Sequence, residues 1–222
     1  MRHTTAFALT VTLTVLLAAM ALAVAQDGTG TAKTEKNQAS SAYHKTLVKS
    51  GYAPVNGLRM YYEIHGTGTA RPLITIHPWL GLANVFPSLS RNRQLIAVEL
   101  QGHGRTADID RPITFEQHAE DVVALMKHLG IEQADFFGES FGGTVSVLIA
   151  LRHPELVRRV VTYASPLGTF EPDAKSVADF ISLTHDHRSV QFPREAYEKV
   201  APDPSYWPAF FEKAHRITWK GL

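Results

Sequence analysis

The 222-residue chain contains no cysteine, and charged residues make up only 19% of it. The absence of cysteine excludes disulfides, thiol chemistry and cysteine-based zinc sites. The formal net charge is +1, so the sequence has neither the basic excess of a nucleic-acid-binding protein nor a solvating acidic tail. The sequence also shows no metal-binding cluster and no phosphate-binding loop. We therefore expect no cofactor, no metal and no nucleic-acid partner.

The first positive feature is an N-terminus of the export type. Arg2 supplies a basic start, and an apolar stretch follows over residues 6–25. This stretch ends in a small-residue A-x-A site at residues 23–25, which predicts cleavage before Gln26. The alternative is an uncleaved anchor, but three threonines dilute the apolar run. We expect a signal peptide at residues 1–25, a periplasmic or secreted protein, and no stable membrane insertion after cleavage.

The remaining chain divides into three parts by composition. Residues 26–50 are polar and have no apolar period, which predicts a flexible linker. Residues 51–165 alternate short apolar runs with helical periods, as βαβ units with a parallel sheet do. Residues 166–222 are rich in proline and aromatic residues and predict a cap of short helices. Within the core we expect strands at 58–65, 72–77, 94–99, 134–138 and 157–163, and helices at about 115–129 and 140–152.

Two local signals support these helices. Thr114 and Gln117 have the spacing of a capping box at the start of the first helix. The second helix begins at the motif Gly138-Glu139-Ser140-Phe141-Gly142, directly after an apolar strand. A G-x-S-x-G motif between a strand and a helix is typical of a nucleophile elbow, which presents a serine at the carboxyl edge of a sheet. The alternative is a tight glycine turn with an ordinary helix-capping serine.

Three stretches together resemble the α/β-hydrolase superfamily in order and spacing. They are the elbow, Leu73–Gly81, which is similar to the family's oxyanion loop, and Glu99–Thr106, which is similar to its D-x-x-G-x-G-x-S turn. The resemblance implies a mostly parallel sheet flanked by helices, with a helical cap. It also implies Ser140 as nucleophile, Gly138 and Gly142 as elbow glycines, and the backbone N–H groups of Trp79 and Phe141 as the oxyanion hole.

The chain departs from the family pattern at two positions. His77 is followed by Pro78 where the family has glycine, and Glu99 stands where the family has aspartate. Proline lacks an N–H, but the implied oxyanion donor is the next residue, Trp79.

A serine nucleophile also excludes the epoxide hydrolases and haloalkane dehalogenases of this fold, which use a carboxylate there. Ser140 instead fits acyl transfer through an acyl-enzyme.

The acid and the histidine of the triad have no clear counterpart in the sequence. The family order is serine, acid, histidine, whereas this chain ends at Leu222, inside or just after the cap segment. We therefore expect it to be truncated before the last strands of the sheet. Substitute acids would be Glu171 or Asp173. The histidines beyond the elbow, which we expect to pack locally instead, are His153, His185, His187 and His215.

These observations predict an exported serine hydrolase acting on a small-molecule ester or related acyl substrate through Ser140. As an incomplete chain it should have little activity. The alternative is a non-catalytic protein that binds a small molecule on the same scaffold. The oligomeric state is open, since two chains could also pair along the strand at 157–163.

Overall fold

The computed structural model describes residues 43–81, 87–165, 167 and 182–215. The predicted signal peptide and residues 26–42 of the predicted linker lie outside this part of the chain. Among the helices described, none is long and apolar enough to cross a bilayer.

A six-stranded sheet forms the centre of the molecule, in the order β1-β2-β4-β3-β5-β6. Strand β1 (Leu47–Val55) pairs antiparallel with β2 (Leu58–His65), and β2 pairs antiparallel with β4 (Arg93–Val98). The other pairings, through β3 (Ala70–Ile76), β5 (Ala134–Glu139) and β6 (Val157–Tyr163), are parallel. The mostly parallel sheet confirms the predicted α/β architecture, and the five predicted strands lie within two residues of their predicted bounds.

Strand β1 corrects the predicted boundary of the linker. We expected folded sequence from residue 51, whereas the strand begins at Leu47 and a helical turn precedes it at residues 43–46. The local sequence lacks an apolar period because β1 is an edge strand, and its first half is exposed or half-buried. Its pairing with β2 depends on the tertiary structure rather than on its own residues.

Helices α3 (Phe115–His128) and α4 (Phe141–Arg152) pack against each other and against one face of the sheet. Their apolar sides and that face form the main hydrophobic core. Thr114 caps α3 by accepting the Gln117 N–H at 3.0 Å, but the Gln117 side chain donates to Asp121. The reciprocal bond of the predicted capping box is therefore replaced by a bond within the helix.

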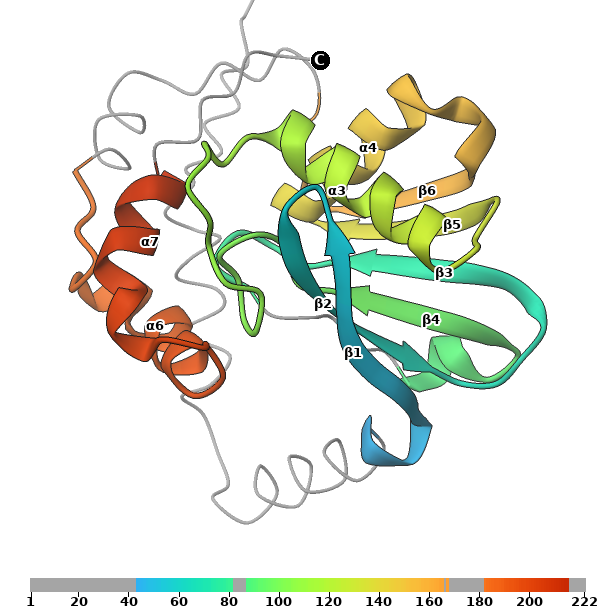
Figure 1. The fold of residues 1–222 in the computed structure, drawn as a ribbon, viewed down its shortest axis with the longest axis horizontal. Helices are drawn as coiled ribbons and strands as arrows, with labels where there is room; N and C mark the ends of the chain where they lie inside the picture. Colours follow the sequence, from blue (N-terminus) through green and yellow to red (C-terminus); the bar gives the residue numbers. More distant parts are fainter. Residues whose placement is uncertain (1–42, 82–86, 166, 168–181, 216–222) are drawn as a thin grey trace, which may run out of the picture.

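The described part of the cap consists of short helical segments that lie at the carboxyl ends of β3 and β4, where the arrowheads of these strands point toward α7 in Figure 1. The segments are η3 (Arg188–Val190), α6 (Gln191–Glu198), η4 (Pro204–Tyr206) and α7 (Trp207–His215). Two short 3-10 segments, η1 (Pro87–Ser90) and η2 (Pro154–Leu156), precede β4 and β6 in the core. The cap has its own buried apolar cluster, which we call the cap cluster. Its members are Leu80, Ile113, Val190, Tyr197, Trp207, Phe210, Phe211 and Ala214.

Candidate active site

Ser140 lies at the junction of β5 and α4 in a strained backbone conformation. Its φ is 48° and its ψ is −115°. A left-handed φ is unfavourable for a residue with a Cβ, and such strain costs about 1–3 kcal/mol. The backbone holds it in place, because its N–H donates to the Tyr163 carbonyl at 2.7 Å and its carbonyl accepts the Gly143 N–H at 3.0 Å. The half-buried side chain makes no capping hydrogen bond to the helix, unlike an ordinary helix-capping serine.

Both elbow glycines are required by close approaches of the backbone. A Cβ on Gly138 would lie 2.3 Å from the Gly142 carbonyl oxygen, and a Cβ on Gly142 would lie 2.3 Å from the carbonyl oxygen of Ile76. The same Cβ on Gly142 would also lie 2.6 Å from the His77 carbonyl oxygen. The elbow therefore packs directly against the end of β3, where the predicted oxyanion loop begins.

The loop after β3 is a tight turn fastened to the core by His77. The Gly81 N–H donates to the Pro78 carbonyl at 2.9 Å and closes the turn. The Leu100 N–H donates to His77 Nε2 at 3.1 Å, so the ring proton is on Nδ1, which donates to the same Pro78 carbonyl at 2.8 Å. Burial lowers the pKa of His77 to about 4, so this neutral tautomer persists at pH 7. The Pro78 carbonyl and the Trp79 N–H belong to the same peptide group, and in a planar trans peptide the C=O and the N–H point in opposite directions. Because the Pro78 carbonyl points toward the His77 ring, the Trp79 N–H points away from it.

Phe141 contributes the first backbone N–H of α4, and its side chain is buried in the main core. Its ring lies 4.5 Å from that of Phe115 and 5.4 Å from that of His118. The first N–H groups of a helix have no partner within the helix and carry its positive dipole end. A buried ring thus anchors the residue whose N–H belongs to the predicted oxyanion hole.

Two further histidines are buried beside this region, and sequence reasoning gave them no role in it. His103 Nδ1 lies 2.9 Å from the Gln101 carbonyl, and its ring centroid lies 4.7 Å from that of His77. Burial lowers the pKa of His118 to about 3 and lowers the pKa of His103 well below its ordinary value. Both rings are therefore neutral at pH 7. His103 could have been found from the sequence because it lies in the glycine-rich turn that resembles a family motif. His118 could not, because nothing in the sequence sets it apart from the other residues of its helix.

Glu99 organises the turn that follows β4. Its carboxylate accepts the Arg105 N–H at 2.5 Å and the Arg105 guanidinium at 2.7 Å. The Thr106 hydroxyl donates to the Glu99 carbonyl at 2.6 Å. A Cβ on Gly104 would lie 2.3 Å from the same carboxylate. The glutamate thus supports the turn through side-chain contacts to its backbone, although the family pattern has aspartate here.

Three of the four histidines beyond the elbow make their hydrogen bonds away from Ser140. Glu171 and Asp173 lie outside the described residues. His153 caps the end of α4 and lies 3.2 Å from Glu120, and His187 is bonded to Ser189 at the start of η3. The His215 ring stacks on Phe211 at 5.3 Å. Within the described structure, none of the hydrogen bonds made by His153, His185 or His187 joins them to Ser140.

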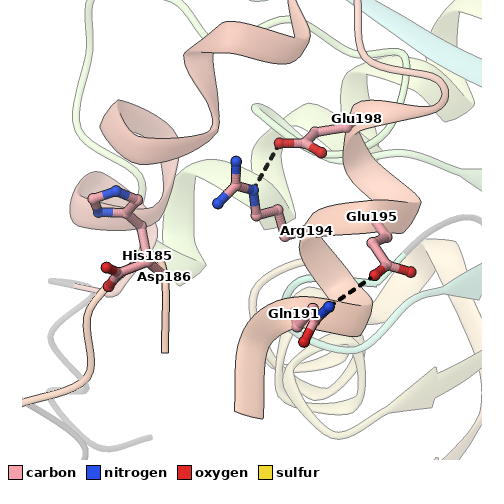
Figure 2. A pocket seen from close by; sticks show the side chains of 6 residues that line it. All are labelled: His185, Asp186, Gln191, Arg194, Glu195 and Glu198. Atoms are coloured by element: carbon pink, nitrogen blue, oxygen red, sulfur yellow. Dashed lines mark hydrogen bonds and ion pairs between the residues drawn. The ribbon is translucent and has the colours of Figure 1, made fainter. Parts of the chain in front are cut away.

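The cap contains a separate polar pocket of about 290 Å³, shown in Figure 2. Arg194 pairs with Glu198 at 2.7 Å and Gln191 donates to Glu195 at 3.1 Å, so most of its polar groups already have partners. Ser140, Trp79 and Phe141 do not line it. No group of three or more His, Asp or Glu side chains in the described ranges could hold a metal ion. The complete lining is His185, Asp186, Gln191, Arg194, Glu195 and Glu198.

Comparisons with known proteins agree with this geometry. A family model described as "alpha/beta hydrolase fold" matches residues 64–207. The 2-hydroxymuconate semialdehyde hydrolase of Pseudomonas sp. strain CF600 is 37% identical over 115 residues, which are 46% of this chain and 39% of that protein. A soluble epoxide hydrolase of Corynebacterium sp. strain C12 is 35% identical over 122 residues, covering 52% of this chain and 41% of that protein. The chain thus spans about two fifths of the length of each.

A solved structure of a hydrolase from Pseudomonas aeruginosa superimposes with a TM-score of 0.56 at 18% identity. The match covers 77% of this chain and 68% of that one. At this identity the likeness concerns the fold alone. The two sequence relatives are both hydrolases, but their names state different substrates, so neither substrate transfers to this chain.

Proposed function

Since the chain belongs to the alpha/beta hydrolase family, we propose that it hydrolyses an ester or a related acyl substrate through an acyl-enzyme on Ser140. The observation that carries the proposal is the left-handed backbone of Ser140 between β5 and α4, with a side chain that makes no capping bond. A protein that only bound a ligand would gain nothing from this strain. The alternative, a non-catalytic binding protein, fits the scaffold but does not account for the elbow.

In the proposed reaction the Ser140 Oγ forms a bond to the substrate carbonyl carbon, and the carbonyl oxygen becomes an oxyanion. The N–H groups of Trp79 and Phe141 stabilise this oxygen. The leaving alcohol departs with a proton as the C–O bond breaks, and water then cleaves the acyl-enzyme. Serine at this position favours acyl transfer over the chemistry of the epoxide hydrolase relative, which in that branch of the fold depends on a carboxylate nucleophile.

The reaction also needs a general base that takes the Ser140 proton, and we assign no described residue to this role. Losing the base costs roughly a million-fold in turnover in a worked serine protease, whereas binding and the oxyanion hole leave about 10³–10⁴ over water. A polypeptide of residues 26–222 without such a base should therefore turn over slowly.

The test is covalent labelling of the full-length native protein with a fluorophosphonate, read by mass spectrometry, together with hydrolysis of a small activated ester. We expect one adduct on Ser140, lost in Ser140→Ala. Ser165→Ala is the matched control, because its hydroxyl donates to the Tyr163 carbonyl at 3.2 Å beside the elbow and it should label normally. Equal ester hydrolysis by wild type and Ser140→Ala would sink the proposal. Ligand binding without any labelling would favour the binding protein.

We also propose that the protein is exported, on the basis of its basic start, apolar stretch and A-x-A site. The intact mass and N-terminal sequence of the native protein decide this. A chain beginning at Gln26 is the expected result, and retention of residues 1–25 would contradict cleavage and favour the uncleaved anchor.

A further inference from the structure

Leu80 belongs to two parts of the molecule at once. It lies in the turn between Pro78 and Gly81, and its side chain is a buried member of the cap cluster with only 7% of its surface exposed. Its φ is 57°, a left-handed value that is unfavourable for a bulky residue. Burial of a leucine side chain contributes enough to offset such strain, so packing against the cap favours the shape of this turn.

Trp79, whose N–H is the proposed oxyanion donor, is also held between core and cap. Its half-buried side chain packs against both the main core and the cap cluster. Its ring lies 5.9 Å from that of Phe211 in α7. His77 fastens the loop to the core. Phe211 of α7 contacts the loop at Trp79.

Helix α7 is docked closely on the core. The Phe210 ring lies 4.9 Å from that of His103, and a Cβ on Gly102 would lie 2.6 Å from the Phe210 ring. This leaves no space for α7 to approach further. Any outward shift of the helix would remove the contact between Phe211 and Trp79 and would open the cap cluster in which Leu80 is buried.

A set of polar contacts to Asp108, which we call the latch, also holds α7 against the core. The Asp108 carboxylate, with a side chain only 3% exposed, accepts the Lys213 ammonium at 2.8 Å and the Tyr206 hydroxyl at 2.8 Å. The Gln101 amide also donates to it at 2.6 Å. Lys213 and Tyr206 belong to the cap and Asp108 to the core, so the latch ties α7 to the loop that follows β4.

We propose that the docked cap positions the oxyanion loop, with Leu80 as the positioning residue that transmits the contact. The elbow does not need the cap, because Ser140 is held by Tyr163 and Gly143. Undocking of α7 therefore leaves the nucleophile in place and releases the turn that orients the Trp79 N–H. The catalytic consequence rests on the proposed function, whereas the effect on the turn does not.

The structural arm of the test follows the Gly81 amide, whose hydrogen bond to the Pro78 carbonyl closes the turn. Hydrogen exchange is measured by NMR for wild type, Leu80→Ala and Lys213→Met. Leu125→Ala is the matched control, since it makes the same deletion in the main core at a residue 1% exposed. We expect exchange at Gly81 to rise about tenfold or more in the first two variants and to change little in the control. Equal exchange at Gly81 in Leu80→Ala and Leu125→Ala, or no change in Lys213→Met, overturns the proposal.

The catalytic arm compares kcat and KM for an activated ester in the same variants. An oxyanion donor acts mainly in the transition state, and loss of one costs about 10²–10³ in kcat. We expect Leu80→Ala to lower kcat at least tenfold with KM nearly unchanged, and Leu125→Ala to retain kcat. An increase in KM alone would mean that Leu80 serves substrate binding instead. If the full-length native protein shows no turnover and no labelling, the proposed function fails, while exchange at Gly81 still decides the positioning role.

Discussion

His118 is a fully buried residue of α3, and neither of its ring nitrogens has a hydrogen-bond partner among the described residues. A buried polar group without a partner costs about 1–3 kcal/mol. The imidazole packs edge-on against the Phe141 ring at 5.4 Å, so the position demands volume rather than polarity. Its contact with Phe141, whose N–H belongs to the proposed oxyanion hole, is the reason that His118 matters for the site.

We therefore predict that His118→Leu raises the free energy of unfolding at pH 7 by about 1 kcal/mol, since it removes the unpartnered nitrogens and retains most of the volume. His118→Ala is the control, because it removes the same nitrogens and leaves a cavity, and it should destabilise the protein by a few kcal/mol. Urea denaturation of both variants gives the answer. A loss of stability in His118→Leu as large as that in His118→Ala would mean that the ring nitrogens have a role in the fold.

At the scale of the elements, β1 and the turn before it complete a buried polar network. The Tyr43 hydroxyl donates to the buried Glu63 carboxylate at 2.5 Å, and the His65 ring lies 3.1 Å from the same carboxylate. Thr46 Oγ1 lies 3.0 Å from the other His65 nitrogen, and the Gly66 N–H donates to the Thr46 carbonyl at 2.8 Å. The segment thus supplies partners for groups that β2 buries.

This network predicts different stabilities for two shortened proteins. A polypeptide that begins at residue 51 should be less stable than one that begins at residue 43 by about 3 kcal/mol or more, because buried Glu63 and His65 lose partners. Tyr43→Phe in the longer polypeptide isolates the contribution of one hydrogen bond. Denaturant unfolding of all three measures the differences, and equal stability of the two polypeptides would show that the fold begins at residue 51 after all.

At the scale of the whole molecule, two fully buried histidines make the folded state less stable at acidic pH. Burial lowers the pKa of His77 to about 4 and that of His118 to about 3. In the unfolded chain a histidine has a pKa of about 6.5. Below that pH the unfolded state binds protons that the folded state does not, so stability is lost as pH falls from 6.5 toward 4. Each such histidine lowers the free energy of unfolding by about 2 kcal/mol between pH 7 and pH 5.

Urea denaturation across this range should therefore show a loss of about 4 kcal/mol from the two residues together, which is large against a usual total of about 5–15 kcal/mol. His118→Leu should reduce the loss by about 2 kcal/mol. A flat profile between pH 7 and pH 5 would mean that both histidines are protonated in the folded protein, contrary to their burial.

The parts of the site that could be predicted are those that depend on neighbouring residues. The elbow needs two glycines around a serine between a strand and a helix, and Gly138 and Gly142 stand where the backbone permits no Cβ. Strands β3 and β4 could be predicted because each contains a continuous buried run, and a run buried on both faces must be apolar throughout. The edge strand β1 could not, because its residues satisfy a partner strand rather than a local period.

The sequence by itself predicted the family, the mostly parallel sheet and the elbow at Ser140, because each of these rests on motifs formed by residues close together in the chain. Only the tertiary structure decided that His77 fastens the loop after β3 to Leu100 and that Leu80 joins the cap cluster in a left-handed conformation. It also decided that Asp108 latches Lys213, more than a hundred residues further along the chain. These contacts join residues that are distant in the chain, and the free energy that selects them comes from burial and pairing that exist only in the folded protein.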